Sequence, residues 1–214
     1  MNRRHCLRLG LATPVALAAP ACTTLPDTDT REPRRAFMRE IARLEGRAFA
    51  GHITANQPPP DDDPFTGRTL VMHVMSVDPA SGEIRIPFHV GDNRSRTWIL
   101  TPNAAGLRLK HDHRLEDGSD DPVTMYGGDT ASPGTPNRQE FPVDQFSREL
   151  FQRNDLDVAL SNVWAMEIHP RRTFIYELSR PDGRLFRVEF DLSRSGRLEL
   201  PPPPWGGGDH QPAA

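Results

Sequence analysis

The sequence predicts an all-β protein: an antiparallel up-and-down meander that closes into a calycin-like barrel of about eight strands, with one or two short helices. Apolar and polar residues alternate along several segments, such as 84–89 and 186–192. The links between such segments are short and rich in Pro, Gly, Asn and Asp, which favours antiparallel neighbours. The chain also has 22 prolines among 214 residues, which excludes a mainly helical protein.

The first 21 residues are typical of an export signal. Arg3 and Arg4 give a basic start, and a short, weakly apolar stretch ends in small residues. The start also resembles the twin-arginine export motif, with the general secretory route as the alternative. A buried N-terminal helix is disfavoured because Pro14 and Pro20 would interrupt it.

Cys22 is the predicted lipidation site. It follows Ala19-Pro20-Ala21, which fits a small-x-small cleavage pattern and resembles a bacterial lipoprotein box. Cleavage would remove Cys6 and leave Cys22 as a lone thiol, which is a liability in an oxidising compartment unless it is acylated. We therefore expect an exported, periplasmic lipoprotein whose Cys22 anchors it to the membrane. A free periplasmic or secreted protein is the alternative.

The mature chain divides into three parts. Residues 22–33 are polar and without hydrophobic period, which predicts a flexible tether. Residues 34–200 are predicted to form the β-barrel domain, beginning with a helix over 34–45 because Phe37 and Ile41 recur at helical spacing. Residues 201–214 are rich in Pro and Gly and predict a disordered or polyproline-like tail.

The domain is predicted to contain eight strands. They are residues 48–56, 69–78, 83–90, 96–101, 106–114, 163–169, 173–179 and 185–192. Eight strands favour closure, because closing the sheet removes its exposed edges. Two long insertions, 57–67 and 115–143, interrupt them and are expected to be either functional or disordered. A helix over 144–153 follows, with Asp144 as its N-cap.

Composition excludes several classes of function. The 26 Lys and Arg residues are fewer than the 29 Asp and Glu residues, so the chain lacks the basic footprint of a nucleic-acid binder. It contains no serine-hydrolase elbow, zinc-protease helix, phosphate-binding loop or Cys-x-x-Cys pair, and no residue is assigned as catalytic.

His111 and His113 lie in the densest polar cluster, Lys-His-Asp-His-Arg at 110–114. On a strand they share one face, so both imidazoles would enter the barrel if that face is buried. They are candidate ligand-binding residues and candidate ligands of a divalent metal ion, although two ligands are too few for a site. The alternatives are hydrogen bonds to the long insertion that follows, or proton transfer. The acidic residues after them do not match an EF-hand, because His113 and Leu115 stand where it has Asp or Asn.

Trp98, Tyr126 and Trp164 are further candidates for lining a ligand pocket. Large aromatic residues at strand spacing are also common as ordinary core, so that interpretation stays open.

Two resemblances bear on the family. Lys-His-Asp-His-Arg at 110–114, Gln-Glu-Phe-Pro-Val-Asp at 139–144, Asn-Val-Trp-Ala-Met-Glu-Ile at 162–168 and Leu-Phe-Arg-Val-Glu-Phe-Asp-Leu at 185–192 resemble a group of uncharacterised exported bacterial lipoprotein-like proteins. That group has no established activity, so the resemblance implies no catalytic residues. Residues 44–51 resemble the opening strand of lipocalin-type barrels, without the Trp of that opening.

The sequence thus favours a non-enzymatic envelope lipoprotein that binds a small apolar or amphipathic ligand without a cofactor. A structural lipoprotein that binds other envelope proteins is one alternative. An enzyme that uses His111 and His113, with a divalent metal, is the other.

Overall fold

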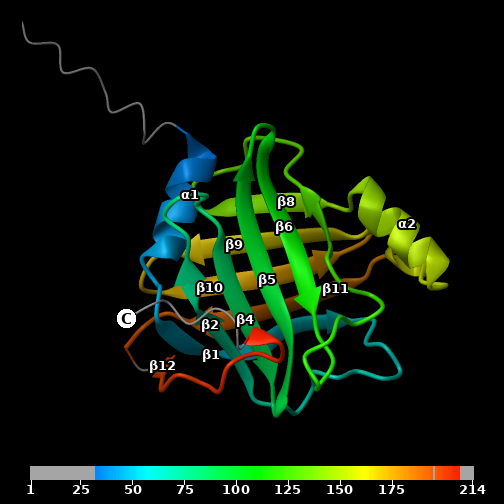
Figure 1. The fold of residues 1–214 in the computed structure, drawn as a ribbon, viewed down its shortest axis with the longest axis horizontal. Coiled ribbons are helices and arrows are strands. Elements are labelled where there is room, and N and C mark those ends of the chain that lie inside the picture. The colour runs from blue at the N-terminus through cyan, green and yellow to red at the C-terminus, as the bar shows by residue number, and fades with distance from the viewer. Residues whose placement is uncertain (1–31, 195, 208–214) are drawn as a thin grey trace, which may run out of the picture.

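Antiparallel strands form a nearly closed barrel in the computed structural model, which describes residues 32–194 and 196–207 (Figure 1). The strands are β1 (Arg47–Gln57), β2 (Leu70–Val74), β3 (Ser76–Val77), β4 (Ile84–Val90), β5 (Asn93–Asn103), β6 (Gly106–His113), β7 (Tyr126–Asp129), β8 (Arg138–Pro142), β9 (Val163–His169), β10 (Thr173–Ser179), β11 (Leu185–Asp191) and β12 (Arg197–Leu198). The helices are α1 (Pro33–Ala42), α2 (Gln145–Arg153) and the short 3₁₀ helix η2 (Asp157–Ser161).

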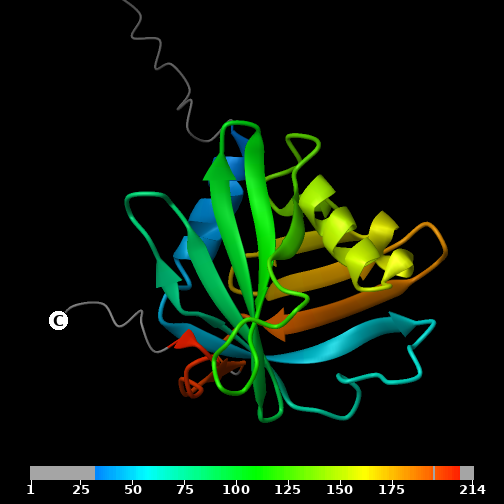
Figure 2. The same ribbon diagram turned by 45° about the vertical axis from the view of Figure 1, so that its right-hand side comes forward.

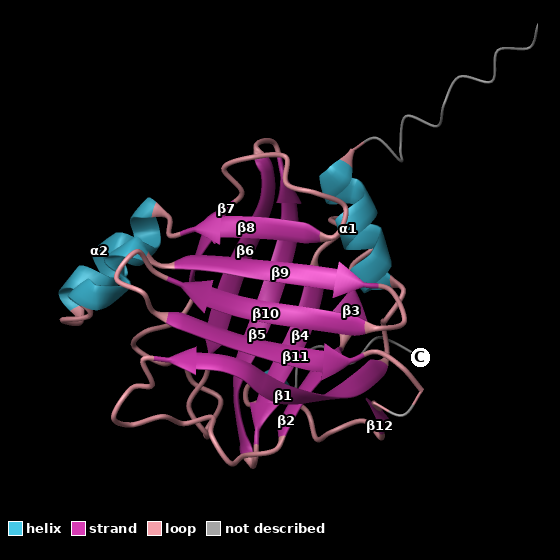
Figure 3. Ribbon diagram, turned by 180° about the vertical axis from the view of Figure 1, so that it is seen from behind, coloured by secondary structure: helices cyan, strands magenta, loops and turns pink. Residues whose placement is uncertain are grey.

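The strand order confirms the predicted meander. Ten strands follow one another as β7-β6-β5-β4-β2-β1-β11-β10-β9-β8, while β3 pairs with β4 and β12 with β1. Apart from the short β3, neighbours in this path are consecutive in sequence except at one place, where β1 lies beside β11 and joins the first half of the barrel to the last. Figures 1 and 3 show that β4, β5 and β6 cross over β8 to β11, so the barrel is flattened into two layers.

The strand count corrects one expectation. Residues 115–143 were expected to form one long insertion, but they contain β7 and β8. β7 extends the sheet from β6, and β8 extends it from β9. These two strands raise the barrel from about eight strands to ten and bring its two edges together.

The barrel closes along a narrow seam between β7 and β8. One bridge joins Gly128 to Val143, and the Asp144 amide donates to the Gly127 carbonyl at 2.9 Å. The buried Ser147 hydroxyl also bonds both the amide and the carbonyl of Gly127. Asp144 caps α2 as predicted, accepting from the Ser147 amide. The first turn of α2 thus supplies hydrogen bonds that the edge of β7 would otherwise lack.

Alternating side chains fill the middle of the barrel. On β11, Phe186, Val188 and Phe190 are buried while their neighbours in sequence are partly exposed, as the alternation predicts. Trp98 lies between Phe88 and Tyr176 in a stack with ring centroids 4.8 and 4.4 Å apart. The centre of the barrel is therefore a solid aromatic core.

The two helices lie at opposite ends of the barrel (Figure 1). α1 confirms the predicted N-terminal helix and buries Phe37 and Ile41 next to β8 and β9. Its first residue, Pro33, belongs to the segment that was expected to be tether. α2 lies at the other end, on the same side as the loop between β1 and β2 (Figures 1 and 2). None of the described helices is both long enough and apolar enough to cross a membrane.

The start of the C-terminal tail differs from the expected disorder. Residues 201–207 lie on the outer surface of the barrel, where the Trp205 amide donates to the Arg94 carbonyl at 3.0 Å. Arg94 in turn donates to the Pro203 carbonyl at 2.8 Å. Trp205 and Pro204 face outward residues of β4, β5 and β6, including Thr97. The sequence predicted a disordered or polyproline-like segment, but it gave no sign that the segment packs on the sheet. The signal segment, Cys22 and residues 208–214 lie outside the described residues.

A charged cluster ties four strands together on the outer surface. Arg138 on β8 donates to Glu167 on β9 at 2.5 Å and to Glu177 on β10 at 2.8 Å. Arg187 on β11 donates to the second oxygen of Glu177 at 2.5 Å. Because Glu177 is largely buried, these bonds are shielded from solvent better than ordinary surface pairs.

We expect Arg138→Met to lower the free energy of unfolding by about 1–2 kcal/mol, since it leaves Glu167 and Glu177 short of a cation. Arg43→Met is the matched control, because the side chain of Arg43, at the C-cap of α1, is 64% exposed where it pairs with Glu40 and should contribute less than about 0.5 kcal/mol. Urea unfolding of both variants measures the difference, and equal losses would contradict the argument.

Candidate functional site

A pocket of about 390 Å³ opens at the α2 end of the barrel, and we call it the mouth pocket. Its walls carry six aromatic rings: Phe65, Tyr126, Phe151, Trp164, Tyr176 and Phe186. Its polar lining residues are Arg96, His113, Asp121, Asn162 and Arg184. An apolar cavity with a few polar groups is the usual form of a small-molecule site.

Strand ends and loops build this pocket. Arg96 lies near the start of β5, His113 ends β6, and Trp164 lies at the start of β9. Phe65 comes from the loop between β1 and β2, where Asp63 fixes the backbone by accepting from the Phe65 amide. This loop was expected to be functional or disordered, and it contributes a wall of the pocket.

His111 lies beneath the pocket, fully enclosed. Its Nδ1 is 3.2 Å from the Tyr126 carbonyl, which can only accept, so Nδ1 carries the proton and donates. Its Nε2 therefore accepts from the Tyr176 hydroxyl at 2.8 Å. Burial, aided by repulsion from His113 when that ring is protonated, lowers the pKa of His111 to about 3, so the ring is neutral near pH 7. His111, a predicted ligand-binding residue, does not line the mouth pocket; it supports Tyr126, whose ring stacks on it at 4.6 Å.

His113 shares the inward face with His111, as the strand spacing predicts, and it does line the pocket. Its Nε2 lies 3.1 Å from the Tyr126 hydroxyl. Burial, together with the positive charge of Arg96, lowers the pKa of His113 to about 4. Burial also raises the pKa of Tyr126 to about 12, so both groups are neutral near pH 7.

The three aromatic candidates separate in the structure. Tyr126 and Trp164 line the pocket, with ring centroids 5.7 Å apart. Trp98 is only 1% exposed and belongs to the central stack, so it is core and not pocket lining. The alternative interpretation of aromatic residues as core is therefore right for Trp98.

Two arginines of the pocket were missed by sequence reasoning. Arg96 uses Nη1 to bond the Asn93 side chain at 2.9 Å, and it lies over the Phe65 ring at 5.3 Å. Arg184 also uses Nη1 for its three hydrogen bonds, and it lies over the Phe186 ring at 5.8 Å. A signal for Arg96 was present, because its position is in phase with the inward-facing Trp98 on the same strand.

Asn162 is a third pocket residue that the sequence did not reveal. Its side chain is 6% exposed and lines the pocket, yet its Oδ1 has no hydrogen-bond partner among the described residues. The backbone of Asn162 is held in place, since its amide donates to Ala159 and its carbonyl accepts from Val143. Leaving a buried amide oxygen unpaired costs about 1–3 kcal/mol, which a bound ligand with a donor would recover.

Residues 32–194 and 196–207 contain no group of side chains that could form the predicted metal site. In that part of the chain no three His, Cys, Asp or Glu side chains lie close enough together to hold a metal ion. Asp112, between the two histidines, faces outward and pairs with Arg114 at 2.7 Å.

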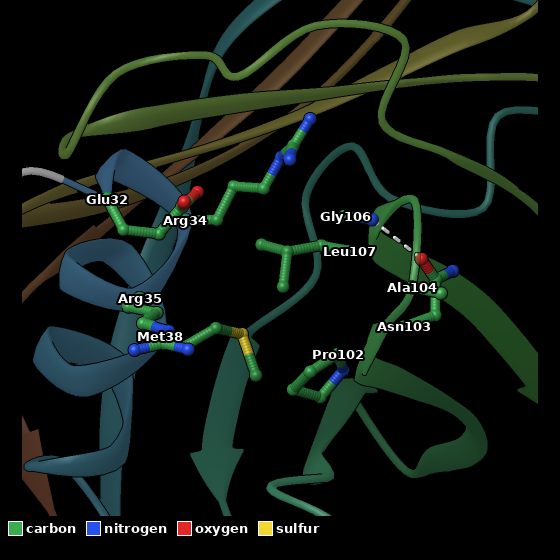
Figure 4. A pocket seen from close by; sticks show the side chains of 9 residues that line it. All are labelled: Glu32, Arg34, Arg35, Met38, Pro102, Asn103, Ala104, Gly106 and Leu107. Atoms are coloured by element: carbon green, nitrogen blue, oxygen red, sulfur yellow. Dashed lines mark hydrogen bonds between the residues drawn. The ribbon is translucent and has the colours of Figure 1, made fainter. Parts of the chain in front are cut away.

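A second cavity of about 370 Å³ lies at the other end of the barrel, between α1 and the turn joining β5 to β6 (Figure 4). Met38 and Leu107 supply its main apolar contacts, and none of the described residues that line it is aromatic. It therefore offers a ligand much less apolar surface than the mouth pocket does.

No protein-family model, curated protein or solved structure matches the chain. The geometry of the mouth pocket is therefore the basis on which we infer a function.

Proposed function

We propose that this protein is a non-enzymatic binding protein that holds a small amphipathic ligand in the mouth pocket. The observation that carries the proposal is the buried side-chain Oδ1 of Asn162, which lies in an aromatic pocket and has no hydrogen-bond partner among the described residues. A pocket that only filled space would have no reason to keep an unsatisfied polar group. Six rings would bind the apolar body of the ligand, and the polar groups would orient it.

We further propose that the chain is exported and anchored to the membrane through lipidated Cys22, as the first 22 residues predict. Expression of the full chain with labelled palmitate tests this. The wild type should be labelled and sediment with membranes, and Cys22→Ser should do neither. Equal labelling or membrane association of the variant would contradict the proposal.

Binding can be tested with N-phenyl-1-naphthylamine, a neutral probe whose fluorescence rises in apolar sites. We expect saturable binding to the wild type. Ala159→Trp should weaken it at least tenfold, because Ala159 lines the pocket and a large ring there would fill it. Val158→Trp is the matched control, since Val158 is the preceding residue of η2 and is 66% exposed.

Two results would overturn the binding proposal. One is the absence of saturable probe binding by the folded wild type. The other is equal affinity in the Ala159→Trp and Val158→Trp variants, which would place the probe elsewhere.

Asn162 also gives a stability prediction. We expect Asn162→Leu to leave the free energy of unfolding unchanged or to raise it by about 1 kcal/mol, because the side-chain Oδ1 that it removes has no partner among the described residues. Asn154→Leu is the control, since the Asn154 amide donates to the Leu150 carbonyl at 2.8 Å and its loss should cost about 1 kcal/mol. Thermal and urea unfolding measure both variants. A large loss for Asn162→Leu would show that the side chain serves the fold and not a ligand.

A further inference from the structure

We infer that the ligand of the mouth pocket carries an anionic head group that Arg96 and Arg184 bind. This inference rests on the proposed function and narrows it to one chemical class: a carboxylate-type amphipath with one apolar body.

Arg96 has hydrogen-bond donors that no described residue uses. Its Nη1 is used internally, by the Asn93 side chain and the Ser95 hydroxyl. Its Nε and Nη2 make no hydrogen bond with any described residue, and no described carboxylate lies within ion-pair distance of it. These two nitrogens form the side-on fork that matches the two oxygens of a carboxylate. Burial lowers the pKa of Arg96, which is the effect expected of a guanidinium partly removed from water without a close counter-ion.

Arg184 repeats the arrangement. Its Nη1 bonds the Asn56 side chain and the carbonyls of Pro58 and Leu185. Its Nε and Nη2, like those of Arg96, have no hydrogen-bond partner in the described part of the chain. Because the side chain is largely buried and held by three bonds, this fork is fixed before any ligand arrives.

Two phenylalanine rings support the pair of arginines. Phe65 and Phe186 are in contact, with centroids 4.5 Å apart. Arg96 lies over the first ring and Arg184 over the second. The rings therefore hold the flat faces of the guanidinium groups by cation–π contact, and the edges stay available for hydrogen bonds.

The other titratable groups of the pocket do not cancel this charge. His113 is neutral near pH 7, and Tyr126 and Tyr176 are neutral because burial raises their pKa. Asp121 is the one carboxylate of the lining; it accepts from the Val123 amide and makes no ion pair with a described arginine. The whole chain carries a formal charge of -3, whereas the described lining of the pocket has two arginines and one carboxylate. The pocket is therefore positively charged in a protein whose net charge is negative.

Two probes that differ only in one negative charge measure how much that charge contributes to binding. Anilinonaphthalene-8-sulfonate has the same phenylnaphthylamine skeleton as the neutral probe but adds one sulfonate. We expect the sulfonate probe to bind wild-type protein about ten- to a hundredfold more tightly, the range of one charge-assisted hydrogen-bond pair. Dodecanoate should likewise displace the neutral probe at lower concentration than 1-dodecanol does, and dodecyl phosphate shows whether a phosphate head serves as well.

Variants assign the effect to the two arginines. Arg96→Met should weaken binding of the sulfonate probe about tenfold and change binding of the neutral probe less than twofold, which also shows that the pocket is intact. Arg96→Lys, which keeps the charge but loses the fork, should fall between them. Arg184→Lys tests the second fork in the same way. Arg108→Gln is the charge-matched control, since Arg108 pairs with Asp129 on the outer surface near the other end of β6.

These measurements distinguish a failure of the proposed function from a failure of the anionic head group. If neither probe binds saturably, the proposed function is wrong. If both probes bind with equal affinity, or if the preference for the anion survives Arg96→Met and Arg184→Lys, the function stands and the anionic head group is wrong.

Discussion

Gly128→Ala is expected to destabilise the barrel by more than about 3 kcal/mol, or to prevent folding. A Cβ at Gly128 would lie 1.9 Å from the Pro142 carbonyl oxygen and 2.7 Å from the Pro142 carbonyl carbon. Both atoms belong to the backbone of β8, so no side chain can move aside. The seam between β7 and β8 would have to open.

The neighbouring Gly127 lies against β6, the strand on the other side of β7. A Cβ at Gly127 would lie 1.9 Å from the Leu109 carbonyl oxygen on β6. The two glycines thus let β7 fit between β6 and β8, where no side chain has room at either position. We expect Gly127→Ala to be as damaging as Gly128→Ala.

The control for both variants is Gly183→Ala. Gly183 has a φ of +93° in the turn before β11, but a Cβ there would meet nothing within 4 Å. Its cost should be the backbone strain alone, about 1–2 kcal/mol. Urea unfolding of the three variants makes the comparison. A loss for Gly128→Ala no larger than that for Gly183→Ala would mean that the seam is not tightly packed.

The same glycines explain why two strands were missed in the sequence. β7 has only four residues, two of them Gly127 and Gly128, so it has no alternation to detect. β8 has Gln139 and Phe141 on its inward face, but five residues ending in a proline resemble a loop. Strands with longer alternation, such as β11, were found because their side chains face the core directly. β7 and β8 form because their backbones pair with neighbouring strands, and a local sequence pattern does not reveal such pairing.

The candidate site was predictable only in part. The spacing of His111 and His113 predicted that both rings lie on one face of their strand, and the structure shows that this face is the inward one. It did not show that His111 has both nitrogens satisfied, because its partners Tyr126 and Tyr176 come from distant strands. Asn162 carries no signal in the sequence, since its importance lies in the hydrogen bond that it lacks.

Acid is expected to destabilise the protein between about pH 6.5 and pH 4, before its carboxylates are protonated. Burial lowers the pKa of His111 to about 3, and that of His113 and His89 to about 4. In the unfolded chain each would titrate near 6.5, so between these limits the unfolded state binds more protons than the folded state. Stability therefore falls as the pH falls, by as much as about 2 kcal/mol for each histidine at pH 4.5.

Carboxylates affect the stability of the protein at lower pH than the histidines do. Asp129 and Asp144 have a lowered pKa, in Asp129 mainly through its bond with Arg108 and in Asp144 through bonds that outweigh burial. Their contribution is present above about pH 4 and is lost below it. The loss between pH 6.5 and pH 4.5 can therefore be assigned to the histidines.

His111→Gln tests this assignment, because glutamine can keep hydrogen bonds to Tyr126 and Tyr176 but cannot be protonated in this range. The free energy of unfolding, measured in urea at pH 7 and pH 4.5, should fall by about 2 kcal/mol less in this variant than in the wild type. His52→Gln, at an exposed position on β1, is the control and should behave as wild type. An unchanged pH dependence in His111→Gln would mean that His111 accepts a proton in the folded barrel, which its two neutral partners and its full burial argue against.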